Sequence, residues 1–247
     1  MIAGVDGTRD GWVVAFADGW PCPSVPRMHL AATFAEVVTL TADCDAVAVD
    51  MPLGLPSRGD VRLCDELARK ELAARSGPDV KAGSRVFLAP PREAVYGHGG
   101  SPKNFQTLHR EHRGVGAGLP VWGIVPKLIE ADEALCAQPA LQDRIVECHP
   151  ELAFARLAGQ VLPSKHAAPG VMQRMALLSR HIAGFHDIAL SGAFRSATVD
   201  DILDALVCLS TAAYLATEAD ISSPQSRRLP SQSVPRDARG LRMEIWF

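Results

Sequence analysis

The chain has 247 residues, of which 47% are hydrophobic and 21% are charged. This composition is typical of a globular chain with a sizeable core, in one large domain or two small ones, and it excludes an intrinsically disordered protein. The formal net charge of −3 provides no general attraction to nucleic acid or to an anionic membrane, so either partner would require a local basic patch.

The sequence also indicates a cellular compartment. No stretch approaches roughly 18 uncharged apolar residues, and the N-terminal segment reaches Asp6 and Arg9 before a signal-peptide core could form. The six cysteines contain no CxxC pair, and most lie in apolar or helical segments. We therefore expect a cytoplasmic protein with reduced, buried thiols and no membrane partner.

The first elements of the chain are predicted to be strands. Residues 2–6 form a short apolar run, residues 7–11 have turn chemistry, and residues 12–17 form a second apolar run. This pattern predicts a β-hairpin with Asp6 at its mouth. Residues 27–32 are expected to supply a third strand.

A short helix and a fourth strand follow. Residues 33–40 begin with Thr33, and Glu36 stands at capping-box spacing from it, which predicts a helix. Residues 45–50 are apolar between two acids and are followed by prolines and glycines that forbid continuation of a strand. Asp50 is therefore expected at the C-terminal end of that strand.

The middle of the chain has a different pattern. Residues 57–138 read as helices interrupted by glycine and proline, with helices at 60–74 and 126–136 and a loop over 86–100. We interpret 57–138 as a helical insertion, or cap, after the fourth strand, within a single domain that spans 1–247.

The last third of the chain is predicted to complete a sheet and to cover it. Residues 144–148 predict a fifth strand that stops at a proline. Amphipathic spacing and apolar content predict three further helices, at 151–158, 171–182 and 199–218. A loop at 222–240 and a final apolar stretch at 241–247 are predicted to follow. The predicted fold class is α/β, a mixed sheet flanked by helices.

Five acids stand where such a fold could bring them together, namely Asp6, Asp50, Glu147, Asp201 and Asp204. Ligands gather at the C-terminal ends of strands in α/β sheets, and carboxylates that are partly exposed there suit a hard cation. Asp201 and Asp204 are three apart on a helix and so share one face. The alternative interpretation is that these acids only cap turns and the start of the last helix.

The order of the acidic motifs is similar to that of the ribonuclease H fold. The motifs are GVDGT around Asp6, AVDMPLGLP around Asp50, and DDILDALVCL over residues 200–209. In that fold an acid on the first strand, an acid on the fourth strand and one or two acids on the last helix hold Mg²⁺ or Mn²⁺. The segment Asp201 to Leu206 is also similar to the corresponding helix of RuvC-type Holliday-junction resolvases.

A closer resemblance covers nearly the whole chain. It rests on the hairpin and Asp50 motifs together with RLCDELAR (62–69), SRVF (84–87), PR (91–92), IVPK (124–127) with Glu130 and Asp132, ECHPE (147–151) and IWF (245–247). Together these motifs resemble a family of predicted RNase H-fold nucleases that is catalogued as a domain of unknown function, DUF429. The resemblance implies an RNase H-like fold and a site for Mg²⁺ or Mn²⁺.

The activity that this resemblance implies is two-metal hydrolysis of a phosphodiester by a nuclease-like hydrolase. Two ions about 3.5–4 Å apart would activate a water and stabilise the leaving oxygen. Several carboxylates are needed to offset their charge, and the five acids named above would suffice.

Basic residues suggest where a phosphate-bearing substrate would bind. Residues 58–113 contain eleven lysines or arginines against seven acids, a local excess of four positive charges. The candidate substrate contacts are Arg58, Arg62, Arg85 and Arg92, which fall in loops near the Asp50 turn, and Lys127. The alternative is a solvated helical face with ion pairs one turn apart.

His149 is a further candidate, as a metal ligand, a proton shuttle or a substrate contact, because histidine titrates near neutral pH. The alternative is a hydrogen-bonded structural residue at a strand-to-helix turn.

Two other functions compete with the nuclease hypothesis. The tripeptide at residues 6–8 resembles the phosphate-contacting hairpin of ASKHA-type phosphotransferases, although 247 residues leave little room for their second domain. A non-catalytic binding or scaffold protein could also retain the fold, but carboxylates held together without a cation repel one another. The sequence leaves the oligomeric state open, as well as the choice between nucleic acid and a small phosphoester.

Overall fold

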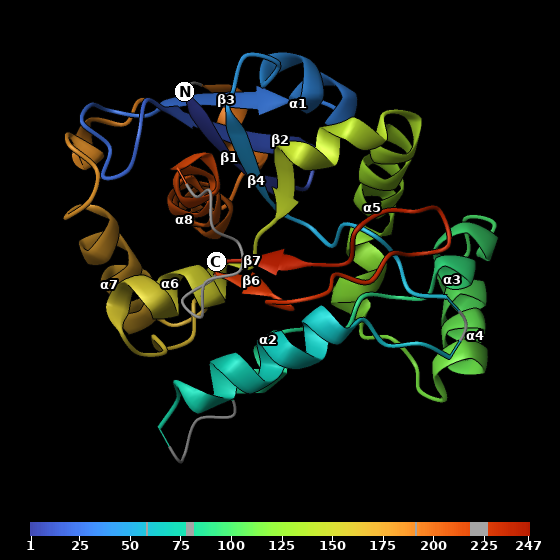
Figure 1. The fold of residues 1–247 in the computed structure, drawn as a ribbon. Coiled ribbons are helices and arrows are strands. Elements are labelled where there is room, and N and C mark those ends of the chain that lie inside the picture. The colour runs from blue at the N-terminus through green and yellow to red at the C-terminus, as the bar shows by residue number, and fades with distance from the viewer. Residues whose placement is uncertain (58, 78–81, 191, 218–226) are drawn as a thin grey trace.

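The computed structural model describes residues 1–57, 59–77, 82–190, 192–217 and 227–247. Its centre is a mixed five-stranded sheet with helices on both faces (Figure 1), which confirms the predicted α/β class. The strands are β1 (Ile2–Thr8), β2 (Gly11–Ala17), β3 (Arg27–Ala31), β4 (Ala46–Asp50) and β5 (Ile145–Glu147).

The strand order is β3-β2-β1-β4-β5. Strands β1, β2 and β3 are antiparallel neighbours, whereas β4 is parallel to both β1 and β5. The two strands that end near Asp6 and Asp50 are therefore adjacent and parallel. In the β1–β4 register Asp6 lies directly opposite Asp50.

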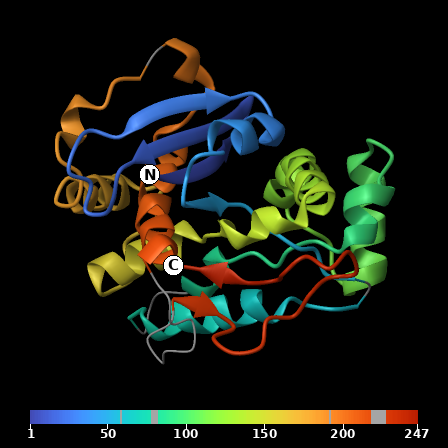
Figure 2. The same cartoon turned by 45° about the horizontal axis from the view of Figure 1, so that its top comes forward.

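Eight α-helices are described, and a short hairpin of strands lies near the C-terminus (Figures 1 and 2). The helices are α1 (Phe34–Leu40), α2 (Leu63–Ala74), α3 (Arg92–Gly97), α4 (Pro102–Arg113), α5 (Leu119–Ala137), α6 (Pro150–Ala158), α7 (Ala168–Leu178) and α8 (Val199–Thr217). The hairpin strands are β6 (Arg228–Leu229) and β7 (Ile245–Trp246), and short 3-10 turns lie at Ala82–Arg85, Pro139–Asp143, Phe185–Asp187 and Gly192–Ser196.

The sheet is buried on both faces because its central strands are apolar at nearly every position. Side chains alternate between two cores. One core holds Ile2, Ala46 and Ala48 against α2, α6 and α8, and the other holds Val5 and Val47 against α1 and α5. Since Asp6 and Asp50 stand an even number of positions from Ile2 and Ala48, they face the same side of the sheet as α8.

Helix α8 lies unusually close to β1 at Gly4. A Cβ atom built on Gly4 would lie 2.1 Å from the carbonyl oxygen of Ala205 and 2.8 Å from the amide nitrogen of Leu209. Only glycine permits this approach, because the obstructing atoms belong to the helix backbone. The contact fixes the first turns of α8 over the sheet.

Replacement of Gly4 by alanine is expected to lower the free energy of unfolding by about 3 kcal/mol, the upper end of the usual cost of overpacking, because the helix must move away from the strand. Urea denaturation measures the change. Gly19→Ala is the matched control, since a Cβ atom at Gly19 meets nothing within 4 Å. Equal stabilities of the two variants would contradict this account of the packing.

Several predicted boundaries are correct to within a few residues, and two expectations are wrong. The capping box of α1 is confirmed, because the amide of Glu36 donates to Thr33 Oγ1 over 3.2 Å. The predicted loop over 86–100 contains α3, and the helix predicted to start at Pro126 begins at Leu119 instead. Proline costs a helix one hydrogen bond, but α5 is buried along one face against the sheet, and this packing offsets the loss.

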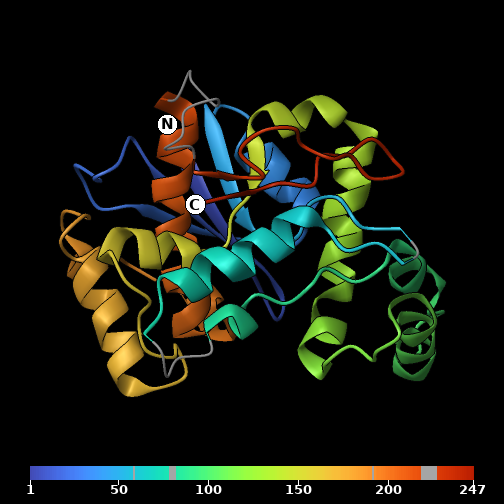
Figure 3. The same ribbon diagram turned by 60° about the horizontal axis from the view of Figure 1, so that its bottom comes forward.

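The segment that follows β4 holds α2 to α5 before the chain returns to β5. Helix α5 contributes buried side chains to the core against the sheet, whereas α3 and α4 lie at one end of the molecule (Figure 3). Part of the predicted insertion at 57–138 thus belongs to the core. In the predicted loop at 222–240, residues 222–226 lie outside the described residues, and the rest includes β6.

The C-terminal hairpin extends the edge of the sheet. Trp246 in β7 forms a parallel bridge with Cys148, directly after β5. Cysteines 22, 44, 64, 148 and 208 are buried, whereas Cys136 is partly exposed, and all six are free thiols. Over the residues that the structure describes, none of the helices is both long enough and apolar enough to cross a bilayer.

Candidate functional site

Three aspartates meet where β1, β4 and α8 come together. Asp6 lies near the end of β1, Asp50 is the last residue of β4, and Asp204 lies in the second turn of α8. One carboxylate oxygen from each lies within 4.8 Å of the other two. The structure therefore brings together three of the five acids that the sequence analysis named.

The side chains of this triad are largely withdrawn from water. Asp6 and Asp204 are 7% and 2% exposed, and Asp50 is half-buried. Burial, followed by the charge of Asp50, raises the pKa of Asp6 well above its usual range. Burial and the charge of Asp204 raise the pKa of Asp50 in the same way. Folding therefore brings together three carboxyl groups whose simultaneous ionisation is unfavourable.

Lys165 is the cation nearest to the triad. Its Nζ atom lies 2.7 Å from Asp204 Oδ2 and donates a hydrogen bond to it. Burial raises the pKa of Asp204 to about 6 even though Lys165 opposes the shift. Lys165 stands in the loop between α6 and α7, where no periodicity or motif distinguished it, so the sequence analysis missed it. Only the packing of that loop against α8 brings it to the triad.

Lys127 lies on the opposite side of the triad. Its Nζ atom is 5.1 Å from the ring centre of Trp12, and its carbon stem lies against Gly7. Glu130 accepts hydrogen bonds from Trp12 Nε1 at 3.0 Å and from the amide of Phe34 at 2.8 Å. Since Lys127 comes from α5 and lines the same hollow as Asp6, it fits the predicted role of a substrate contact.

Two hollows adjoin the triad, one on each side of Asp50. The first, of about 340 Å³, is lined by Asp50, Asp204, Arg85, His149 and Lys165, among others. The second, of about 270 Å³, is lined by Asp6, Asp50, Arg9 and Lys127, among others. Both hollows therefore place basic side chains beside the triad.

Glu147 does not belong to the triad. It is 4% exposed, and its two carboxylate oxygens each lie 2.7 Å from a terminal nitrogen of Arg62, while Oε2 also accepts from the amide of Leu53 at 2.7 Å. Burial raises the pKa of Glu147 to about 7, although Arg62 opposes the shift. The ion pair with Arg62 holds the Glu147 carboxylate against the loop that follows β4.

Arg62 is 1% exposed, so the expectation that it lies on a phosphate-facing surface is wrong. Besides Glu147, its guanidinium contacts Asp65 and donates to the carbonyl oxygens of Leu53 and Gly54, each at 3.2 Å. These bonds hold the loop that follows Asp50. Arg62 and Glu147 thus stabilise the position of Asp50 through this loop.

The remaining predicted residues occupy three different environments. Asp201 and Thr198 form a reciprocal cap at the start of α8, which is the alternative that the sequence left open. Arg92 pairs with Asp132 at 2.6 Å and with Asp237, so it ties α3 to the C-terminal segment and not to the triad. Arg58 lies outside the described residues.

Arg85 and His149 lie on the wall of the larger hollow. Arg85 donates to Glu151 at 2.7 Å and to the carbonyl oxygen of Leu162 at 2.8 Å. Burial lowers the pKa of His149 to about 4, so its imidazole is neutral at pH 7. Its Nδ1 atom is buried and has no hydrogen-bond partner among the described residues. His149 is thus placed to contact a bound molecule.

The stability of the metal-free protein is expected to fall as the pH rises from 6.5 to 8. Raised folded-state pKa values mean that the folded protein holds protons on Asp6, Asp50 and Glu147 that the unfolded chain has already lost, so ionisation destabilises the fold. His149, with a folded pKa of about 4, opposes this trend only below about pH 6.5, where the unfolded histidine gains its proton.

Asp50→Asn should therefore be more stable than the wild type at pH 8 in EDTA, by about 1–3 kcal/mol, with the difference shrinking toward pH 5. Urea denaturation across this range measures it. Asp43→Asn, which removes an exposed carboxylate, is the control. A wild type that gains stability from pH 6.5 to 8 would contradict the repulsion argument.

The donor set of the triad fits a hard divalent cation. Three carboxylates supply oxygen ligands, and the adjoining hollows leave room for water or substrate on the same ion. Cation binding would also offset the repulsion that raises the pKa values of Asp6 and Asp50. The fold and this site define an α/β protein with a buried three-aspartate cluster at the carboxyl ends of two parallel strands.

The chain belongs to the DUF429 family, described as a protein of unknown function, because the family model matches residues 4–228. This confirms the family that the sequence motifs predicted. Comparison with curated proteins and with solved structures found no significant match to either.

Proposed function

We propose that this protein is a metal-dependent phosphodiesterase, nuclease-like in its chemistry, with Asp6, Asp50 and Asp204 as the ligands of Mg²⁺ or Mn²⁺. The observation that carries the proposal is the convergence of three carboxylate oxygens within 4.8 Å at the carboxyl ends of β1 and β4. The strand order β3-β2-β1-β4-β5, with acids on the first strand, the fourth strand and the last helix, supports an RNase H-like fold.

A divalent cation at the triad would supply activation of a water molecule and neutralisation of charge on phosphate oxygens. The chain's own residues contribute the rest. Lys165 and Lys127 lie on either side of the triad and would attract the phosphate. Arg85 and neutral His149 line the hollow beside Asp50, where they would orient the groups attached to the phosphate.

Lys165 has a second role in this proposal. Its ammonium group lies on Asp204 at 2.7 Å and offsets part of the triad's charge. Although burial opposes its charge, Asp204 and Asp50 raise the pKa of Lys165, so it stays protonated at neutral pH. We expect Lys165 to turn from Asp204 to the substrate phosphate when a cation takes over the carboxylate.

The experiment that tests the proposal is a metal titration followed by an activity assay. Millimolar Mg²⁺ or Mn²⁺ should raise the melting temperature of the wild type, because a ligand that binds only the folded state stabilises it. Asp50→Asn should blunt the shift, and Asp43→Asn should retain it. Calorimetry that detects no cation binding to the wild type would remove the main support of the proposal.

The activity assay uses Mn²⁺ with branched DNA, single strands, RNA–DNA hybrids and bis(p-nitrophenyl) phosphate. Cleavage of any of these above the background seen in EDTA supports a phosphodiesterase. A wild type that binds the cation but cleaves none of them would favour a binding protein that retains the site.

A further inference from the structure

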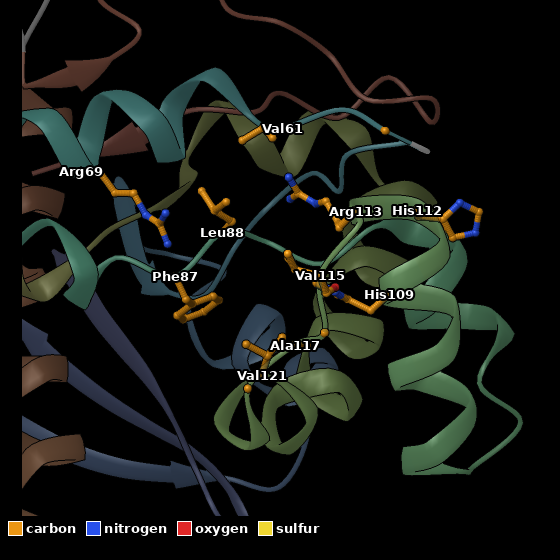
Figure 4. Close-up of a pocket in the computed structure, with 13 residues that line it drawn as sticks. Val61, Arg69, Phe87, Leu88, His109, His112, Arg113, Val115, Ala117 and Val121 are labelled. Atoms are coloured by element: carbon orange, nitrogen blue, oxygen red, sulfur yellow. The ribbon is translucent and has the colours of Figure 1, made fainter.

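A third hollow lies beside the triad but outside it, between α2, the end of α4 and the start of α5 (Figure 4). Its volume is about 420 Å³. Two arginines, two histidines and several apolar side chains line it, and none of its thirteen lining residues is an acid. The pocket therefore combines two guanidinium groups with apolar walls.

Each arginine donates one hydrogen bond to the backbone, and its other guanidinium nitrogens have no hydrogen-bond partner among the described residues. Arg69 donates from Nε to the carbonyl oxygen of Val86 at 2.7 Å, and its two terminal nitrogens make no hydrogen bond to the described residues. Arg113 donates from Nη2 to the carbonyl oxygen of Ala89, while its buried Nε and Nη1 atoms have no partner there. The unpaired buried donors of Arg113 are costly, and the two guanidinium groups together would attract an anionic ligand into the pocket.

The arginines also fix the apolar wall. Their two carbonyl partners bracket Phe87 and Leu88, and the amide of Ala89 donates to Asp65 at 2.9 Å. Phe87 is 38% exposed and Val115 is 64% exposed, so large apolar side chains face water at this pocket. An aromatic ring that is clamped in place and exposed offers a stacking surface for a planar group.

Phe87 joins this pocket to the triad, because it also lines both of the hollows beside Asp50. A molecule with one phosphate at the triad could therefore reach the pocket past a single aromatic side chain. A repeating chain of phosphates and planar groups meets this geometry, since one unit can occupy the triad and the next the pocket.

We propose that this pocket is a subsite for a nucleotide next to the scissile phosphate, which makes the substrate a single-stranded oligonucleotide. The inference rests on the proposed phosphodiesterase function. The base stacks on Phe87 against Leu88 and Val121, and its phosphate binds Arg69 and Arg113. An unpaired strand is required because bases inside a duplex are stacked and cannot enter a pocket.

Binding of fluorescein-labelled strands to the full chain in EDTA tests the subsite without any hydrolysis. The probes are a deoxythymidine strand and a uridine strand of eight residues each, and a DNA duplex of the same length. Comparison of the two single strands distinguishes DNA from RNA. The wild type should bind one of the single strands at least about tenfold more tightly than the duplex. No single-strand binding at low salt, or equal binding of the duplex, would overturn the proposal.

Val115→Glu is the decisive variant, because an exposed position tolerates the change while a carboxylate enters the pocket. We expect its affinity for the single strand to fall about tenfold. Met172→Glu, at a 68% exposed site that lines neither this pocket nor the hollows of the triad, is the matched control and should bind like the wild type. Equal affinities of the two variants would overturn the subsite.

Two further variants separate charge from stacking. Arg113→Gln should lower the slope of log Kd against log salt by about 0.7, whereas Phe87→Ala should weaken binding about tenfold without changing that slope. Because EDTA removes the cation, these results stand apart from the activity assay. A subsite that binds strands while the wild type cleaves nothing would defeat the phosphodiesterase and leave the pocket established.

Discussion

Asp6→Asn is expected to lower Mn²⁺-dependent phosphodiester cleavage by about three orders of magnitude or more. Asparagine keeps the shape of the side chain but removes one of three charges that would hold the cation, and Asp6 lies within 4.8 Å of both other ligands. At the same time, the metal-free variant should melt at a higher temperature than the wild type, because the change relieves repulsion with Asp50.

A fall in activity together with a rise in stability distinguishes a functional carboxylate from a structural one. A residue needed only for folding would lower both quantities together. The measurements are initial rates on the substrate panel and thermal melting in EDTA at pH 8, with Asp43→Asn as the control. Equal cleavage by Asp6→Asn and the wild type over the whole panel would end the nuclease interpretation and favour a binding protein.

Arg62→Met is expected to cost about 3–5 kcal/mol of folding stability, which is the usual effect of leaving buried charges without a partner. Arg62, Asp65 and Glu147 are all at least 95% buried, and the arginine contacts both acids. Loss of the guanidinium also frees the loop at residues 53 and 54 that follows Asp50.

Urea denaturation measures this loss, and its pH dependence provides a second test. Without Arg62, protonation of Glu147 becomes more favourable, so the variant should recover stability as the pH falls below 7. Arg75→Met is the control, because the pair of Arg75 with Glu71 lies at the surface with both side chains partly exposed, and such pairs contribute about 1 kcal/mol or less. A loss below about 1 kcal/mol in Arg62→Met would contradict the structural role assigned to it.

The position of the triad could be predicted in large part from local patterns. A strand that ends in an acid and then meets prolines stops at that acid, so Asp50 was correctly placed at the end of β4. Alternation of side chains along β1 and β4 then directs Asp6 and Asp50 to the same face. The helical spacing of Asp201 and Asp204 could not decide between them, because both lie on one side of α8.

A local cap and tertiary packing made that decision together. Thr198 engages Asp201 in a cap, whereas the close approach of α8 to Gly4 carries Asp204 over the sheet. Glu147 resembled a fifth ligand in sequence, but it turns to Arg62, which comes from the start of α2, 85 positions earlier in the chain.

The sequence by itself determined most of the elements, the faces of the strands and the family, since these depend on periodicity, turn chemistry and motif order along the chain, but it missed α3 and the start of α5. Only the tertiary structure decided which charges meet. Lys165 reaches Asp204 from a loop without any pattern, and Arg69 and Arg113 share a pocket from different helices. Such encounters depend on how segments distant in sequence pack, and no local pattern encodes the distance between two side chains.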